Sequence, residues 1–105
     1  MLISFPENPE KLTAFEKMHI PAVWLLGSQI KVTVGEKPHL MMPNHFIEWI
    51  ELYKSGELIK HVDLKPNDKP EAIFEVSFES LNELLAREHC NFHGIWQSNK
   101  EEAIE

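Results

Sequence analysis

The residues best suited to chemistry in this chain are a cysteine and a histidine near its C-terminal end. Cys90 and His93 are separated by two residues, and Gly94 follows directly. A thiolate and an imidazole at this spacing reach one metal ion from a single tight turn, and glycine permits the backbone geometry of such a turn. The same pattern fits a buried cysteine that lies beside a histidine by chance. This pair alone is therefore a weak indication of a metal site.

His39 and His45 form a second candidate pair, on a loop that contains Pro38 and Pro43. Each proline restricts its φ angle, which reduces the entropy lost when two imidazoles are held in place. The alternative is an ordinary surface loop with two solvated histidines and with its methionines packed into the core. His19 precedes an Ile-Pro pair and, taken alone, is a loop histidine.

The three segments together supply a mixed donor set of imidazoles and one thiolate, from His19, His39, His45, His93 and Cys90. Structural zinc sites usually contain more cysteine, whereas a set dominated by histidine with one thiolate suits iron or copper. Blue-copper sites normally have a weak methionine ligand after the second histidine, and no methionine follows Cys90. The set therefore favours iron, although other axial groups keep copper open. His61 and His89 lie outside this donor set. For His89, the reason is that an extended chain points the side chains of His89 and Cys90 to opposite faces.

Short segments with β-type patterning must position these ligands. Residues 29–34 alternate apolar and polar side chains, which predicts a half-buried strand. Residues 45–53 and 57–64 are rich in β-branched and aromatic side chains and flank Ser55-Gly56, so they predict a hairpin. Residues 72–78 alternate again and predict a further strand. Short strands at intervals of about ten residues are typical of an all-β sandwich or small barrel.

Length and charge narrow the class of protein. A chain of 105 residues with 43% hydrophobic composition predicts one domain over residues 1–105. The net charge of −7 disfavours nucleic-acid binding. The longest apolar run, residues 20–26, is far shorter than the roughly 20 residues needed to cross a bilayer, so we expect no membrane insertion. The first residues lack a secretory signal pattern, and the single cysteine forms no internal disulfide. A cytoplasmic location is therefore expected.

From about Glu16 to Trp96 the chain resembles the superoxide reductases, the family of neelaredoxin and the iron domain of desulfoferrodoxin. The matching stretches, in order, are His39 with His45, IEWIEL at 47–52, LKP at 64–66, KPEA at 69–72 and AREHCNFHGIW at 86–96. The resemblance implies an immunoglobulin-like seven-stranded β-sandwich. It also implies strand or irregular chain around Ser80, where capping-box spacing to Glu83 would locally predict a short helix.

The resemblance further implies a ligand set and an activity. His19, His39, His45 and His93 would bind one iron (Fe2+/Fe3+) per chain in a plane, with Cys90 axial and the sixth position open. The implied reaction is the one-electron reduction of superoxide to hydrogen peroxide, after which an electron donor such as rubredoxin restores the iron. The implied assembly is a homo-oligomer, either a dimer or a tetramer. The alternative is a non-catalytic iron-binding or electron-transfer domain that retains the ligands.

The residues before the first histidine depart from the family pattern. Members commonly have Glu-Lys directly before it, whereas this chain reads Glu16-Lys17-Met18-His19, which moves both residues back by one position. We hypothesise that Lys17 supplies the charge that attracts superoxide and that Glu16 caps the oxidised metal. The alternative is a solvated Glu-Lys pair on a mobile loop. No cysteine precedes Cys90, so the chain resembles the single-iron members without the four-cysteine domain.

Overall fold

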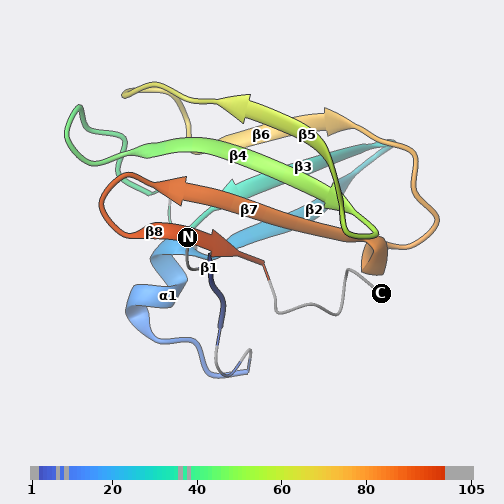
Figure 1. The fold of residues 1–105 in the computed structure, drawn as a ribbon, viewed down its shortest axis with the longest axis horizontal. Coiled ribbons are helices and arrows are strands. Elements are labelled where there is room, and N and C mark those ends of the chain that lie inside the picture. The colour runs from blue at the N-terminus through green and yellow to red at the C-terminus, as the bar shows by residue number, and fades with distance from the viewer. Residues whose placement is uncertain (1–2, 7, 9, 36, 38, 99–105) are drawn as a thin grey trace.

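Two β-sheets face each other in a computed structural model that describes residues 3–6, 8, 10–35, 37 and 39–98 (Figure 1). The elements are β1 (Ile3–Ser4), α1 (Ala14–His19), β2 (Pro21–Leu26), β3 (Gln29–Val34), β4 (Ile47–Lys54), β5 (Glu57–Asp63), β6 (Glu71–Glu75), the 3₁₀ helix η1 (Leu81–Glu83), β7 (Leu84–Cys90) and β8 (Gly94–Gln97). One sheet has the strand order β1-β8-β7-β4-β5 and the other β2-β3-β6. The predicted all-β sandwich is confirmed, and the two-residue strand β1 pairs in parallel with β8 beside the seven strands β2 to β8.

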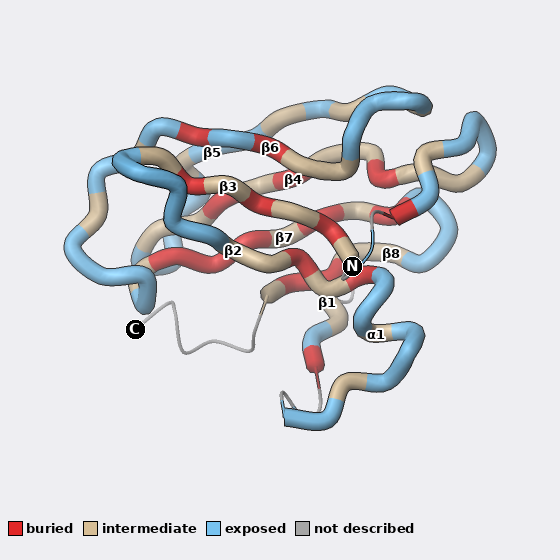
Figure 2. The backbone as a smooth tube through the Cα atoms, turned by 180° about the vertical axis from the view of Figure 1, so that it is seen from behind, coloured by how far each residue is buried: buried red, intermediate tan, exposed pale blue. Residues whose placement is uncertain are grey.

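The hydrophobic core lies between the two sheets. In β3, Ile30, Val32 and Val34 are buried while the residues between them are partly exposed, which is the predicted alternation. Figure 2 shows buried residues gathered along β3, β4 and β7, where the sheets face each other. Cys90, the last residue of β7, belongs to this core and is fully buried. The sulfur of Cys90 therefore lies on the interior side of the candidate site.

The predicted hairpin is formed by β4 and β5. Ser55 and Gly56 connect the strands with φ angles of 49° and 85°. Both values are positive, as a two-residue type I′ turn requires, and glycine adopts such a conformation without steric cost. The further strand predicted over 72–78 is β6, which spans residues 71–75 and so ends earlier than expected.

Two short helices differ from the sequence-based expectations. The segment before His19 is not a loop but the six-residue helix α1, which begins after Thr13. Residues 81–83 form η1 with a capping box between Ser80 and Glu83, so the expectation of strand or irregular chain there is wrong and the local helix signal was correct. Among the described residues no helix combines the length and the apolar character needed to cross a membrane.

Candidate metal centre

Four of the predicted ligands meet at one end of the sandwich. The ligand atoms of His19, His39, His45 and Cys90 all lie within 4.8 Å of one another. His19 ends α1, His39 and His45 lie on the loop between β3 and β4, and Cys90 ends β7 (Figure 1). Segments that are distant in the sequence thus bring three imidazoles and one thiol to a single point.

Backbone carbonyls set the orientation of two of the imidazoles. His19 Nδ1 lies 2.9 Å from the Phe15 carbonyl oxygen, and His39 Nδ1 lies 2.7 Å from that of Leu40. Because a carbonyl oxygen only accepts, each Nδ1 carries the proton and donates it, which leaves the Nε2 lone pair free. This is the arrangement that commonly orients metal-bound histidines.

Two buried ring nitrogens at this site have no hydrogen-bond partner among the described residues. They are Nε2 of His39 and Nε2 of His45. A buried polar atom left without a partner costs about 1–3 kcal/mol, so such atoms are generally hydrogen-bonded, and an exception calls for a water, an ion or another partner. Nitrogen and sulfur donors at these separations are those that transition metals use. The residues present therefore fit a bound metal ion.

His93 reaches the same cluster from the turn between β7 and β8. Its Nδ1 lies 3.0 Å from His19 Nε2 and 3.6 Å from Cys90 Sγ. Two nitrogen ligands about 2.1 Å from one metal and at right angles to each other are about 3.0 Å apart, so the first distance suits neighbouring ligands. The structure thus brings all five predicted ligand residues together, with His93 facing the cluster through Nδ1 rather than Nε2.

The environment of His19, His39 and His45 favours the neutral form of their imidazoles. Burial lowers the pKa of His19, His39 and His45, and neighbouring imidazoles lower it further. Burial raises the pKa of Cys90, although backbone N–H groups of Phe92 and His93 act in the opposite direction. Without a metal the cysteine therefore holds its proton at neutral pH. Metal binding would release that proton, since the thiolate is the ligand.

Comparison with known proteins identifies the family. Residues 11–99 match the family model described as Desulfoferrodoxin. The chain belongs to the desulfoferrodoxin family. It is 45% identical over 78 residues to a protein named "Desulfoferrodoxin homolog" from Methanothermobacter thermautotrophicus, covering 74% of this chain and 60% of that protein. It is 36% identical over 104 residues to a "Putative superoxide reductase" from Methanocaldococcus jannaschii, covering 89% of each.

A solved structure of similar sequence has the same architecture. The crystal structure of the superoxide reductase from Treponema pallidum superposes with a TM-score of 0.68 at 34% sequence identity, covering 78% of this chain and 66% of that one. The chain spans 60 to 69% of the length of the first four curated desulfoferrodoxins that it matches. The family is therefore established for this chain, which corresponds to part of those longer proteins.

Aromatic side chains that sequence reasoning missed surround the histidines of this desulfoferrodoxin-family chain. The Phe15 ring lies 4.5 Å from His19 and 4.9 Å from His93, and Trp96 stacks on His19 at 5.4 Å. Trp96 Nε1 also donates to the His93 carbonyl oxygen at 3.1 Å. A signal for this arrangement was present, because Thr13 and Glu16 have capping-box spacing and Phe15 precedes His19 by four residues, one helical turn.

Glu88, also missed, is a carboxyl group buried beside the candidate metal centre. It is fully buried two residues before Cys90 on β7, and neither of its oxygens has a hydrogen-bond partner among the described residues. Burial raises its pKa to about 9, so it is protonated at neutral pH and places no negative charge there. An acidic residue at an inward position of the β7 alternation was the available signal.

Glu16 and Lys17, the predicted catalytic pair of this family member, lie on α1 rather than on a mobile loop. Glu16 Oε1 accepts a hydrogen bond from the Thr13 backbone N–H at 2.8 Å and so caps the helix. Lys17 lines a hollow together with Trp24 and Thr33 on the other side of the helix end. A residue two positions before His19 projects away from it on a helix. The roles of both residues at the metal stay predictions.

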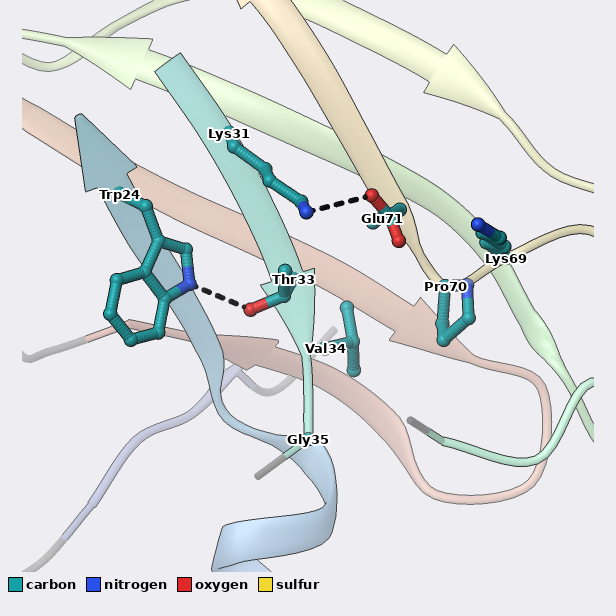
Figure 3. A pocket seen from close by; sticks show the side chains of 8 residues that line it. All are labelled: Trp24, Lys31, Thr33, Val34, Gly35, Lys69, Pro70 and Glu71. Atoms are coloured by element: carbon teal, nitrogen blue, oxygen red, sulfur yellow. Dashed lines mark hydrogen bonds and ion pairs between the residues drawn. The ribbon is translucent and has the colours of Figure 1, made fainter. Parts of the chain in front are cut away.

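A hollow lies on the outer face of the three-stranded sheet (Figure 3). Its volume is about 560 Å³, and Trp24, Lys31, Gly35 and Glu71 are among the residues that line it. Trp24 Nε1 donates to Thr33 Oγ1 at 2.9 Å, and Lys31 pairs with Glu71 at 3.2 Å. The described residues that line it include no histidine or cysteine, so this hollow is separate from the candidate metal centre.

Proposed function

We propose that the chain is a superoxide reductase, which reduces superoxide by one electron to hydrogen peroxide at one iron per chain. The observation that carries this proposal is the convergence of four imidazoles and one thiol, with two buried Nε2 atoms that lack any partner among the described residues. Similarity to proteins named superoxide reductase, including that of Treponema pallidum, supports the activity.

Five residues would hold the iron: His19, His39 and His45 through Nε2, His93 through Nδ1 and Cys90 through Sγ. The bound iron would supply the electron for the reduction. Neutral imidazoles suit Fe(II), and an anionic thiolate donates electron density that favours electron transfer out of the metal. Four imidazoles beside a single thiolate are unusual for structural zinc, which supports iron.

The two sides of the centre differ in their access to water. Cys90 is fully buried in the hydrophobic core, so the core residues exclude water and substrate from the Cys90 side of the centre. His93 is exposed, and the neighbouring Phe92 side chain is 71% exposed. A small anion such as superoxide would therefore arrive from the solvent side, near His93 and Phe92, where water also supplies protons. The carbonyls of Phe15 and Leu40 keep the proton of His19 and of His39 on Nδ1, away from the site.

Lys17 and Glu16 have proposed roles that differ in what they require. Lys17 would act through its electric field on the approaching anion, since its position in α1 is within one turn of His19. Glu16 would reach the oxidised metal only after breaking its hydrogen bond to the Thr13 N–H. The first role needs no rearrangement, whereas the second requires the Glu16 side chain to leave its capping position at the start of α1.

The catalytic cycle would also need an external electron donor. Cys90 is the only cysteine of the chain, so a second cysteine-bound iron centre is not available within it. A small redox protein such as rubredoxin, a homo-oligomeric assembly and a cytoplasmic location are parts of the proposal. Sedimentation of the iron-loaded protein would measure the assembly, and reduction of the oxidised protein by rubredoxin would test the donor.

Two measurements on the purified protein test the proposed function. Metal analysis should find one iron per chain, and oxidation should produce a visible sulfur-to-iron charge-transfer band. Pulsed superoxide should then be consumed with formation of peroxide and without dioxygen. A zinc protein without such a band would contradict the iron site. An iron protein with the band that leaves superoxide unconsumed would instead support the electron-transfer alternative.

A further inference from the structure

Gly35 lies where the two segments that carry His19 and His39 meet. It follows the last residue of β3, and Figure 3 shows it beside the end of α1. A Cβ atom added to Gly35 would lie 2.9 Å from the Met18 carbonyl oxygen, 3.4 Å from the His39 amide nitrogen and 2.4 Å from the Lys37 carbonyl oxygen. Real Cβ atoms essentially never approach backbone atoms to less than 3.0 Å. A side chain at this position would therefore force the Met18 and Lys37 carbonyls away, whereas its 3.4 Å separation from the His39 amide nitrogen is ordinary van der Waals contact.

The affected backbone atoms lead directly to the imidazoles. Met18 is bonded to His19, and Lys37, whose carbonyl a Cβ would meet at 2.4 Å, lies two residues before His39. Each ring is also tied to its own segment, since His19 Nδ1 bonds to the Phe15 carbonyl and His39 Nδ1 bonds to that of Leu40. The two ring centroids lie 4.9 Å apart. Because the rings are fixed to the backbone, a displacement of either segment moves the corresponding Nε2 atom.

We propose that Gly35 is a positioning residue, whose missing side chain sets the spacing between His19 and His39 in the metal centre. This inference rests on the proposed metal site and deepens it. Gly35 touches neither metal nor substrate and acts only through the two ligand segments. Metal sites require their ligands within a few tenths of an ångström of the preferred geometry, so a shift of this kind acts on metal affinity directly.

The competing explanation is that Gly35 is an ordinary turn glycine, needed only for its φ of +88°. Gly27, in the turn between β2 and β3, provides the matched control. Its φ is also positive, at +62°, but a Cβ added there would meet nothing within 4 Å. Substitution at either position incurs the strain of a positive φ. Only substitution of Gly35 also displaces the ligand segments.

The experiment compares Gly35→Ala with Gly27→Ala in the full chain, with Co(II) as the probe metal. Affinity is measured by competition with a chelator, and coordination is followed through the thiolate-to-cobalt and ligand-field absorption bands. Thermal unfolding of the metal-free variants records the general cost of the substitution. We expect Gly35→Ala to weaken Co(II) binding at least tenfold more than Gly27→Ala and to change the absorption bands, which Gly27→Ala leaves as in the wild type.

Equal affinities and unchanged bands in the two variants would overturn the proposal. Asparagine adopts positive φ more readily than alanine, so Gly35→Asn and Gly27→Asn repeat the comparison with less backbone strain. If neither Gly35 variant folds while both Gly27 variants do, the glycine serves the fold as a whole and the proposal is wrong. Because Co(II) binding is read without superoxide, a wild-type protein that binds cobalt but does not reduce superoxide contradicts the proposed function and leaves this comparison valid.

Discussion

The histidines of the candidate metal centre and those on the outer face of the five-stranded sheet have opposite surroundings. At the metal centre, His39 and His45 each have a buried Nε2 atom with no partner among the described residues. On the outer face of the five-stranded sheet, His61 uses both ring nitrogens, since Nδ1 lies 2.8 Å from Glu51 Oε2 and Nε2 lies 2.8 Å from Asp63 Oδ1. His89 Nδ1 likewise lies 2.7 Å from Glu48 Oε1.

These surroundings change the chemistry of the same side chain. Burial lowers the pKa of His39, whereas hydrogen bonds to Asp63 and then Glu51 raise the pKa of His61. A neutral imidazole with a free lone pair binds metals, while an imidazolium between carboxylates has no lone pair to offer. The comparison teaches that the partners of both ring nitrogens, rather than the presence of a histidine, decide which histidines serve a metal.

Removal of single ligands should separate the two regions most strongly. We expect His45→Gln and Cys90→Ser each to lower the superoxide reduction rate by at least about a hundredfold. Mutation of residues that only hydrogen-bond to metal ligands typically lowers metal affinity or activity tenfold to hundredfold, and loss of a ligand itself should exceed this. His61→Gln is the matched control and should retain activity within about twofold, since its partners lie outside the centre. Stopped-flow decay of superoxide and metal content measure both. Full activity of His45→Gln would remove it from the ligand set.

Metal removal should destabilise the folded chain, because the bound metal stabilises the candidate metal centre. A ligand that binds only the folded state at a hundred times its Kd stabilises that state by about 2.7 kcal/mol. For a chain of 105 residues this corresponds to a Tm shift on the order of 10 °C. Calorimetry with and without Fe(II) measures the shift. The shift should persist in His61→Gln and disappear in His45→Gln, and equal shifts in both variants would argue against the proposed site.

The pH dependence of stability should have opposite signs in the two regions of the metal-free protein. The raised pKa of His61 means that its stabilisation is complete below the ordinary value of 6.5 and is lost as the pH rises through the raised value. Because His61 and Asp63 are well exposed, we expect the difference in unfolding free energy between wild type and His61→Gln to be below about 1 kcal/mol at pH 5.5 and to vanish by pH 9. Urea unfolding at both pH values measures it.

His39→Gln supplies the opposite trend in the same experiment. The pKa of His39 is lowered, so its contribution to stability is present above 6.5 and is lost as the pH falls through the lowered value. The difference between wild type and His39→Gln should therefore change in the acidic range rather than the alkaline range. Parallel pH curves for the two variants would contradict the contrast between the regions.

Local patterns in the sequence predicted those elements that depend on local physics. The alternation over residues 29–34 matches β3 in both bounds, and Ser55-Gly56 forms the predicted turn. The capping boxes at Thr13 and Ser80 carried equally local information, and each begins a helix. Each helix start therefore depends only on residues within one turn, so both are predictable from the sequence.

Contacts between segments that are distant in the sequence could not be predicted from local sequence patterns. The candidate ligands could be named from residue type and resemblance, but the 3.0 Å approach of His19 to His93 joins residues 74 positions apart. The carboxylate partners of His61 depend on the strand register that places Glu51 opposite it, and register cannot be read from one strand alone. The close packing at Gly35 likewise exists only once β3 and α1 meet.

The smallest predicted effect concerns Lys17, an exposed residue of α1. Its proposed field would act on superoxide over a distance comparable to the Debye length, which is about 10 Å at 0.1 M salt. Lys17→Ala should therefore slow the second-order reaction about two- to threefold at low ionic strength and have no effect at high salt. Lys60→Ala, on the distant strand β5, removes the same charge from the opposite region and should leave the rate unchanged. Equal salt dependence in both variants would assign the effect to net charge alone, because each variant changes −7 by the same amount.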